Sequence, residues 1–151
     1  MKLPACGLYR TTAPIGAIPA GRLVYFHNHG DPGPGLYLPE SWKHNRIRLS
    51  ARGTLLPTPE DARSLLALPP EGFYRVLSGF HCCEKQCRFF EAEMLLQLGY
   101  DSAGEALLFT PELIDGMLAI PERGSRVQLE RLTHIERLKV AVHERDPHAI
   151  Q

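Results

Sequence analysis

The sequence predicts an α+β domain dominated by short antiparallel strands, arranged as a curled sheet or partial barrel, with one or two short helices. Thirteen glycines and thirteen prolines interrupt the 151 residues, which favours many short elements joined by turns. Several segments between them are rich in aromatic and branched residues or alternate in polarity, as strands do. Because the chain has the usual length of one domain and is 44% hydrophobic, we expect residues 1–151 to form a single globular domain.

The first half of the chain is predicted to hold several strands and one helix. Residues 1–21 are interrupted by prolines and are expected to be irregular, apart from a short strand at Leu8 to Thr11. Strands are expected where Val, Tyr and Phe are frequent or where polarity alternates, at 22–29, 36–38 and 46–52. A helix is expected within 57–70, because Thr58 can cap it, Pro59 suits its first position and two prolines end it.

The second half is predicted to be mostly strands. Residues 83–98 fit both a helical stripe and an alternating strand, and we expect one or two helical turns at 83–91 followed by a strand at 93–100. The other strands are expected at 73–80, 105–111 and 117–120, and a short helix from Leu129 onward. Residues 143–151 are expected to fray. We find no internal repeat.

The charge pattern excludes some partners. Seventeen basic and seventeen acidic residues cancel, so no overall field draws the chain to nucleic acid or an anionic membrane, although the basic segment 43–52 leaves nucleic-acid binding as a weaker alternative. No segment resembles an export signal or a membrane span. We therefore expect a cytoplasmic protein, in which the four cysteines are reduced thiols or metal ligands.

Two histidines and a cysteine cluster are the candidate metal site. His27 and His29 are two residues apart on a predicted strand, so their imidazoles should project from one face. In "HCCEKQC", Cys83 and Cys87 would lie one turn apart on a helix. Two imidazoles and two thiolates are a ligand set typical of structural zinc, and we predict a site formed by His27, His29, Cys83 and Cys87.

Other interpretations of these residues stay open. Cys82 or His81 could replace one ligand, and Cys6 could join a three-thiolate site as a long-range partner. The cysteines are otherwise explained as small apolar core residues without a metal, and the histidines as hydrogen-bonding groups at a strand end. Basic residues beside the Cys82/Cys83/Cys87 cluster would also favour a reactive thiolate.

The paired histidines carry two partial resemblances. "GRLVYFHNH", residues 21–29, is similar to the start of the first cupin motif, and "HNHGDPGPG" resembles the His-x-His loop of JAMM-type zinc peptidases. Both families use carboxylates beside the histidines, and this chain has no acidic residue before Asp31. Without such a base, metal-bound water would lack its proton acceptor.

The sequence therefore favours a non-enzymatic function, a small domain that binds another protein and holds either a structural zinc or no cofactor. The binding surface is predicted around the proline-stiffened loop 30–35, with Asp31, Tyr37 and Trp42 as contact residues, because a stiff loop loses little entropy and Tyr and Trp are frequent in binding hot spots. The alternative is a metal- or thiol-dependent enzyme that uses the His27/His29 pair or the Cys82/Cys83/Cys87 cluster.

Overall fold

In the computed structural model, which describes residues 2–143, the chain is β-rich, with 42% of residues in strands and 8% in helices. All strand pairs are antiparallel, and the sheets are not closed into a barrel. The predicted dominance of short antiparallel strands is confirmed. The α+β label fits only roughly, because the described residues contain two short 3-10 helices and no longer helix.

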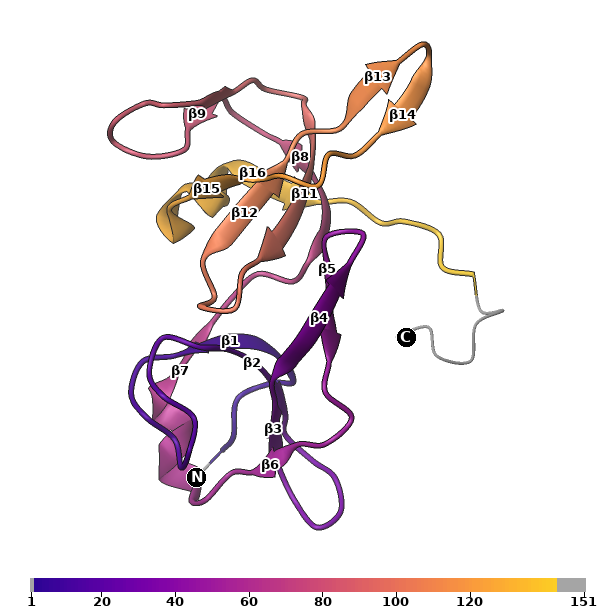
Figure 1. The fold of residues 1–151 in the computed structure, drawn as a ribbon. Coiled ribbons are helices and arrows are strands. Elements are labelled where there is room, and N and C mark those ends of the chain that lie inside the picture. The colour runs from indigo at the N-terminus through magenta and orange to yellow at the C-terminus, as the bar shows by residue number, and fades with distance from the viewer. Residues whose placement is uncertain (1, 144–151) are drawn as a thin grey trace.

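The elements follow one another closely along the chain (Figure 1). The first half contains β1 (Gly7–Thr11), β2 (Leu23–His27), β3 (Gly35–Tyr37), β4 (Pro39–Lys43), β5 (Arg46–Leu49), β6 (Thr54–Leu55), η1 (Pro59–Ser64) and β7 (Leu65–Ala67). The second half contains β8 (Gly72–Val76), β9 (Phe80–His81), β10 (Phe89–Phe90), β11 (Leu95–Tyr100), β12 (Ala106–Phe109), β13 (Glu112–Ile114), β14 (Met117–Ala119), β15 (Ser125–Val127), η2 (Leu129–His134) and β16 (Ile135–Arg137).

The two halves repeat one topology. Strand order is β6-β3-β2-β1-β7 in the first sheet and β15-β12-β11-β8-β16 in the second. In each, a 3-10 helix leads directly into the last strand, which pairs with the first strand of its sheet. Each half also inserts a hairpin before its fourth sheet strand, β4–β5 in the first and β13–β14 in the second. We call residues 7–67 the first repeat and residues 72–137 the second.

Residues at equivalent positions of the two repeats support this duplication, although their similarity is too short to predict it from the sequence. "GLYRT" forms β1 and "GFYRV" forms β8. The hydroxyls of Tyr9 and Tyr74 each donate a 2.6 Å hydrogen bond to the carbonyl four residues earlier. Gly53 and Gly124 also correspond, since a Cβ atom would lie 2.7 Å from a ring atom of Tyr37 and 2.9 Å from one of Phe109, respectively. The expectation of no internal repeat is therefore wrong.

The larger hydrophobic core belongs to the second repeat but includes residues of the first. Leu23 and Ile47 pack in the same buried cluster as Leu96, Leu98 and Tyr100 of β11. A smaller cluster lies within the first repeat and contains Tyr9, Ile15, Ile18, Val24, Phe26 and Leu36. The two repeats are thus joined by shared apolar burial, which stabilises their arrangement.

Two helix predictions needed correction. The helix expected within 57–70 is a 3-10 helix of six residues, and Leu65 leaves it to pair with Thr11 of β1. Residues 83–91 form no helical turns; Gln86 has a left-handed φ of 55° and turns the chain toward β10. The strand predicted after them is confirmed as β11, and the predicted helix after Leu129 is η2.

Among residues 2–143, no helix has the length and hydropathy needed to cross a membrane. The predicted fraying of the C-terminal segment falls almost wholly on residues 144–151, which lie outside the described residues.

Candidate metal centre

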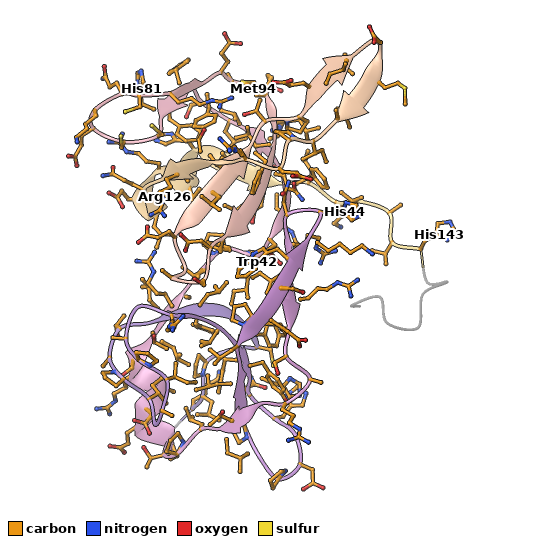
Figure 2. All side chains as sticks on the ribbon, viewed as in Figure 1. Trp42, His44, His81, Met94, Arg126 and His143 are labelled. Carbon is orange, nitrogen blue, oxygen red and sulfur yellow. The ribbon has the colours of Figure 1, made fainter. Side chains whose placement is uncertain are left out.

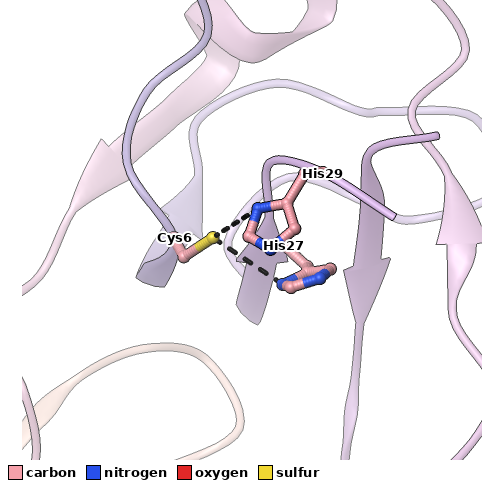
Figure 3. Close-up of side chains that lie close together, drawn as sticks. All are labelled: Cys6, His27 and His29. Carbon is pink, nitrogen blue, oxygen red and sulfur yellow. Dashed lines mark hydrogen bonds between the residues drawn. The ribbon is translucent and has the colours of Figure 1, made fainter. Parts of the chain in front are cut away.

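Three side chains of the first repeat meet at one end of its sheet. Cys6 immediately precedes β1, His27 ends β2, and His29 lies two residues beyond it. In the antiparallel pair β1–β2, Gly7 is opposite Phe26, so Cys6 lies close to His27. Figure 3 shows the Cys6 sulfur directed toward both rings. The first repeat thereby brings one thiol and two imidazoles together.

The distances within this group suit a tetrahedral metal ion. Sγ of Cys6 lies 3.7 Å from Nδ1 of His27 and 3.8 Å from Nδ1 of His29. Zinc bonds of the usual length at tetrahedral angles would separate a sulfur and a nitrogen ligand by about 3.6 Å. The two ring centroids are 4.0 Å apart. The three ligand atoms all lie within 4.8 Å of one another, and the group could hold a metal ion.

Asn28 fixes the geometry of the group. Its backbone N–H donates to Sγ of Cys6 over 3.3 Å, and its Oδ1 accepts from the same thiol over 3.2 Å. Oδ1 of Asn28 is also 2.7 Å from Nδ1 of His29, while its Nδ2 donates to the carbonyl of Pro4. These hydrogen bonds hold the Cys6 thiol and the His29 ring in place. Cys6 and His27 are half-buried, whereas His29 is exposed.

A second group lies in the second repeat, in the turn between β9 and β10. Cys82 is buried with its Sγ 3.7 Å from Sγ of Cys83, and Cys87 is exposed. The backbone N–H of Cys82 donates to the carbonyl of Arg88, which closes the turn. The three sulfurs lie within 4.8 Å of one another and could also hold a metal ion.

The half-buried Cys83 thiol and the exposed Cys87 thiol of this turn differ in acidity. A hydrogen bond from the backbone N–H of Lys85, followed by one from the Cys82 side chain, lowers the pKa of the Cys83 thiol. The hydrogen bond and charge of Cys83 raise the pKa of the Cys87 thiol. Cys83 is therefore the member of the pair that favours the thiolate.

The predicted four-ligand set is divided between these groups. His27 and His29 come together, but with Cys6, while Cys83 and Cys87 come together with Cys82. Among residues 2–143, the structure forms no group that contains all four. The physical reason is the duplication, because the histidines lie on the sheet of one repeat and the cysteine turn on the other.

The predicted contact residues have different environments. Asp31 is exposed in the loop before β3. Tyr37 is half-buried in β3 and lines a shallow hollow with Tyr25 and His27. The indole N–H of Trp42 donates to the carbonyl of Tyr100 over 2.8 Å, and Figure 2 shows Trp42 between the two repeats. Trp42 therefore already has a partner within the chain, although 40% of it is exposed.

Cys6 is the candidate ligand that the sequence analysis did not place beside the histidines. The signal was available, because an antiparallel pairing of "CGLYRT" with "LVYFHNH" carries Cys6 to the end of the histidine strand. Finding it required the register of β1 and β2.

Searches of protein-family models, curated proteins and solved structures found no match to this chain.

Proposed function

We propose that this chain is a metal-binding protein that holds a divalent ion, Zn²⁺, through Cys6, His27 and His29. The observation that carries the proposal is the position of the Cys6 sulfur, 3.7 and 3.8 Å from the Nδ1 atoms of two imidazoles. A borderline-soft ion such as Zn²⁺ prefers this combination of thiolate and imidazole ligands.

The three ligands leave a fourth position of a tetrahedral ion open. Because His29 is exposed, the site faces solvent on that side. Zinc with three protein ligands and an open position binds water or an external ligand, unlike a closed structural site. This favours an ion that meets a partner or a small molecule at the surface over the four-ligand structural zinc that the sequence predicted.

Metal binding at this site depends on pH. The Cys6 thiol must lose its proton and each imidazole must present a lone pair, so the hydrogen bonds that Oδ1 of Asn28 accepts from the Cys6 thiol and from Nδ1 of His29 have to break when the ion binds. Zn²⁺ affinity is therefore expected to rise with pH, with release of protons to the buffer.

Zn²⁺ and Co²⁺ titration of the full chain tests the proposal. We expect Zn²⁺ binding by calorimetry, and with Co²⁺ an absorption band from thiolate-to-metal charge transfer. Cys6→Ser should abolish that band for this site, and both Cys6→Ser and His29→Ala should reduce the number of bound ions by one. The matched control is Cys83→Ser/Cys87→Ser, which removes two thiols from the other group.

The outcomes separate the two groups. Ions that are lost in Cys6→Ser and His29→Ala but retained in Cys83→Ser/Cys87→Ser support the proposal. Absence of binding, or loss of all binding only in the Cys83→Ser/Cys87→Ser control, would overturn it. Circular dichroism of each variant verifies that it is folded.

A further inference from the structure

The hairpin of the first repeat shows how such a hairpin docks on a sheet of this fold. Ile47 of β5 is 6% exposed and packs in the core of the second repeat. The turn residue Asn45 donates through Nδ2 to Oε1 of Gln97 and to the carbonyl of Pro121, each over 2.9 Å. Gln97 in return donates to the carbonyl of His44. The β4–β5 hairpin therefore covers the outer face of β11.

The corresponding hairpin of the second repeat, β13–β14, is exposed to solvent instead of packing on a sheet of the described chain. Its turn, Asp115–Gly116, has left-handed φ angles of 51° and 78°, as His44–Asn45 has φ angles of 53° and 65°. In β4–β5 the docked pair is Trp42 opposite Ile47, and at the same place in β13–β14 Leu113 lies opposite Leu118. Leu113 is 74% exposed and Leu118 60%.

Further apolar side chains surround this pair. Met117 is 74% exposed and Ile114 53%. An apolar hairpin of this kind exposed to water is a typical interaction surface. Figure 1 shows β13–β14 projecting from the second repeat on the side away from the first repeat. The sheet of its own first repeat is thus out of its reach.

The first repeat carries the face that would receive such a hairpin. The strand registers make three residues of the first repeat equivalent in position to three of the second: Tyr25 to Gln97, His27 to Gly99, and Tyr37 to Phe109. In the same way, counting residues from the turn of each hairpin makes Leu49 after β4–β5 equivalent to Ile120 after β13–β14, and Ser50 equivalent to Pro121. The hollow on the first repeat is lined by these counterparts, Tyr25, His27, Tyr37, Leu49 and Ser50.

The face of β11 that receives the β4–β5 hairpin and the equivalent face of the first repeat differ in how far their side chains are buried. Gln97 and Phe109 are buried in the second repeat, where Asn45 contacts Gln97. Their counterparts Tyr25 and Tyr37 are only half-buried. The chain therefore exposes one apolar hairpin on the second repeat and one matching hollow on the first.

We propose that the β13–β14 hairpin docks into the Tyr25/His27/Tyr37 hollow of a second copy of this chain. The contact repeats between molecules the one that β4–β5 makes within the molecule, with Leu113 and Leu118 in the roles of Trp42 and Ile47. It is head-to-tail, so each copy keeps a free hairpin at one end and a free hollow at the other, and association continues into open chains or closes into a ring.

One difference between the faces shapes the contact. Gly99 lets the Asn45 carbonyl approach so closely that a Cβ atom would lie 2.9 Å from it, whereas His27 has an imidazole at that place. The incoming turn would therefore rest against this ring, and Gly116 brings no side chain where Asn45 has its amide. The intermolecular contact is apolar where the internal one is hydrogen-bonded. The proposal does not rest on a bound metal.

Sedimentation of the full chain over a range of concentrations tests the proposal. The wild-type mass is expected to rise above the monomer's 16.9 kDa as concentration increases. Leu113→Glu/Leu118→Glu should weaken association at least about tenfold, because charged side chains would have to be buried. Ser50→Arg, which fills the hollow, should weaken it similarly. Leu66→Glu, a comparably drastic change at a 43% exposed leucine of β7, is the control and should associate like wild type.

Mixing the two defective variants gives the decisive result. Leu113→Glu/Leu118→Glu keeps an intact hollow and Ser50→Arg keeps an intact hairpin, so the mixture should form 1:1 dimers and nothing larger. A wild-type chain that stays monomeric at every concentration, a Ser50→Arg variant that associates normally, or a mixture without dimers would overturn the head-to-tail proposal. Unchanged thermal unfolding of the variants at low concentration verifies their folds.

Discussion

The two repeats have the same strand order, and they differ in what lies on the outer face of the second strand. In the second repeat, β11 presents Gln97 and Gly99 to the β4–β5 hairpin, which buries them. In the first repeat, β2 presents Tyr25 and His27 at the same positions, and this face stays accessible. Duplication of one topology has thus produced one face for internal packing and one face that carries a candidate metal centre.

The comparison extends to the residue before the first strand. Glu71 precedes β8 and accepts a hydrogen bond from the Ile47 backbone N–H over 3.0 Å. At the same place before β1 stands Cys6, which contacts two histidines. One position of the repeat is therefore used for hairpin docking in the second half and for a possible ligand in the first.

The largest expected effect separates the docked hairpin from the exposed one. Ile47→Ala should lower the free energy of unfolding by about 2–4 kcal/mol, because it leaves a cavity in the shared core. Leu118→Ala at the corresponding position should change it by about 0.5 kcal/mol or less, since that side chain is exposed. Urea unfolding at low protein concentration measures both. Equal losses would contradict the assignment of one docked and one free hairpin.

A smaller effect should be shared by the two repeats. Tyr9→Phe and Tyr74→Phe each remove one hydrogen bond to the carbonyl four residues earlier. Each is expected to cost about 0.5–1.5 kcal/mol of unfolding free energy. Each variant serves as the control for the other in denaturant unfolding. If one substitution were costly and the other neutral, the two tyrosines would not be structural equivalents.

The smallest expected effect concerns Glu71 and depends on pH. Burial raises the pKa of the Glu71 carboxyl above its ordinary 4.5, with the hydrogen bond from Ile47 and the charge of Arg46 opposing the shift. The folded state therefore binds this proton more tightly than the unfolded state, and the resulting stability is lost as pH rises through the folded pKa. Glu71→Gln, neutral throughout, should gain stability relative to wild type between pH 4 and pH 7.

The control for this measurement is Glu40→Gln, a substitution at an exposed glutamate of β4. Denaturant unfolding at both pH values gives the difference for each variant. A Glu71→Gln variant that becomes less stable than wild type as pH rises would mean that the hydrogen bond from Ile47 to the carboxylate outweighs burial.

Local sequence patterns predicted the strands well and the helices less well. Alternating or β-branched segments gave β2, β5, β11 and β12 within a few residues, because a half-buried strand needs that pattern wherever it lies. The expected helical turns at residues 83–91 failed because the apolar spacing there also suits a turn that buries Cys82 and Phe90 against the sheet. The pairing of β7 with β1 likewise ended the first helix early.

The amino-acid sequence by itself determined the class of short antiparallel strands and the closeness of His27 to His29, because both follow from local backbone periodicity. The tertiary structure decided which thiol joins the histidines, that Cys83 and Cys87 lie elsewhere, and that one of two equivalent hairpins is docked on a sheet. These depend on strand register and on the packing of one repeat against the other, which bring together residues that are far apart along the chain.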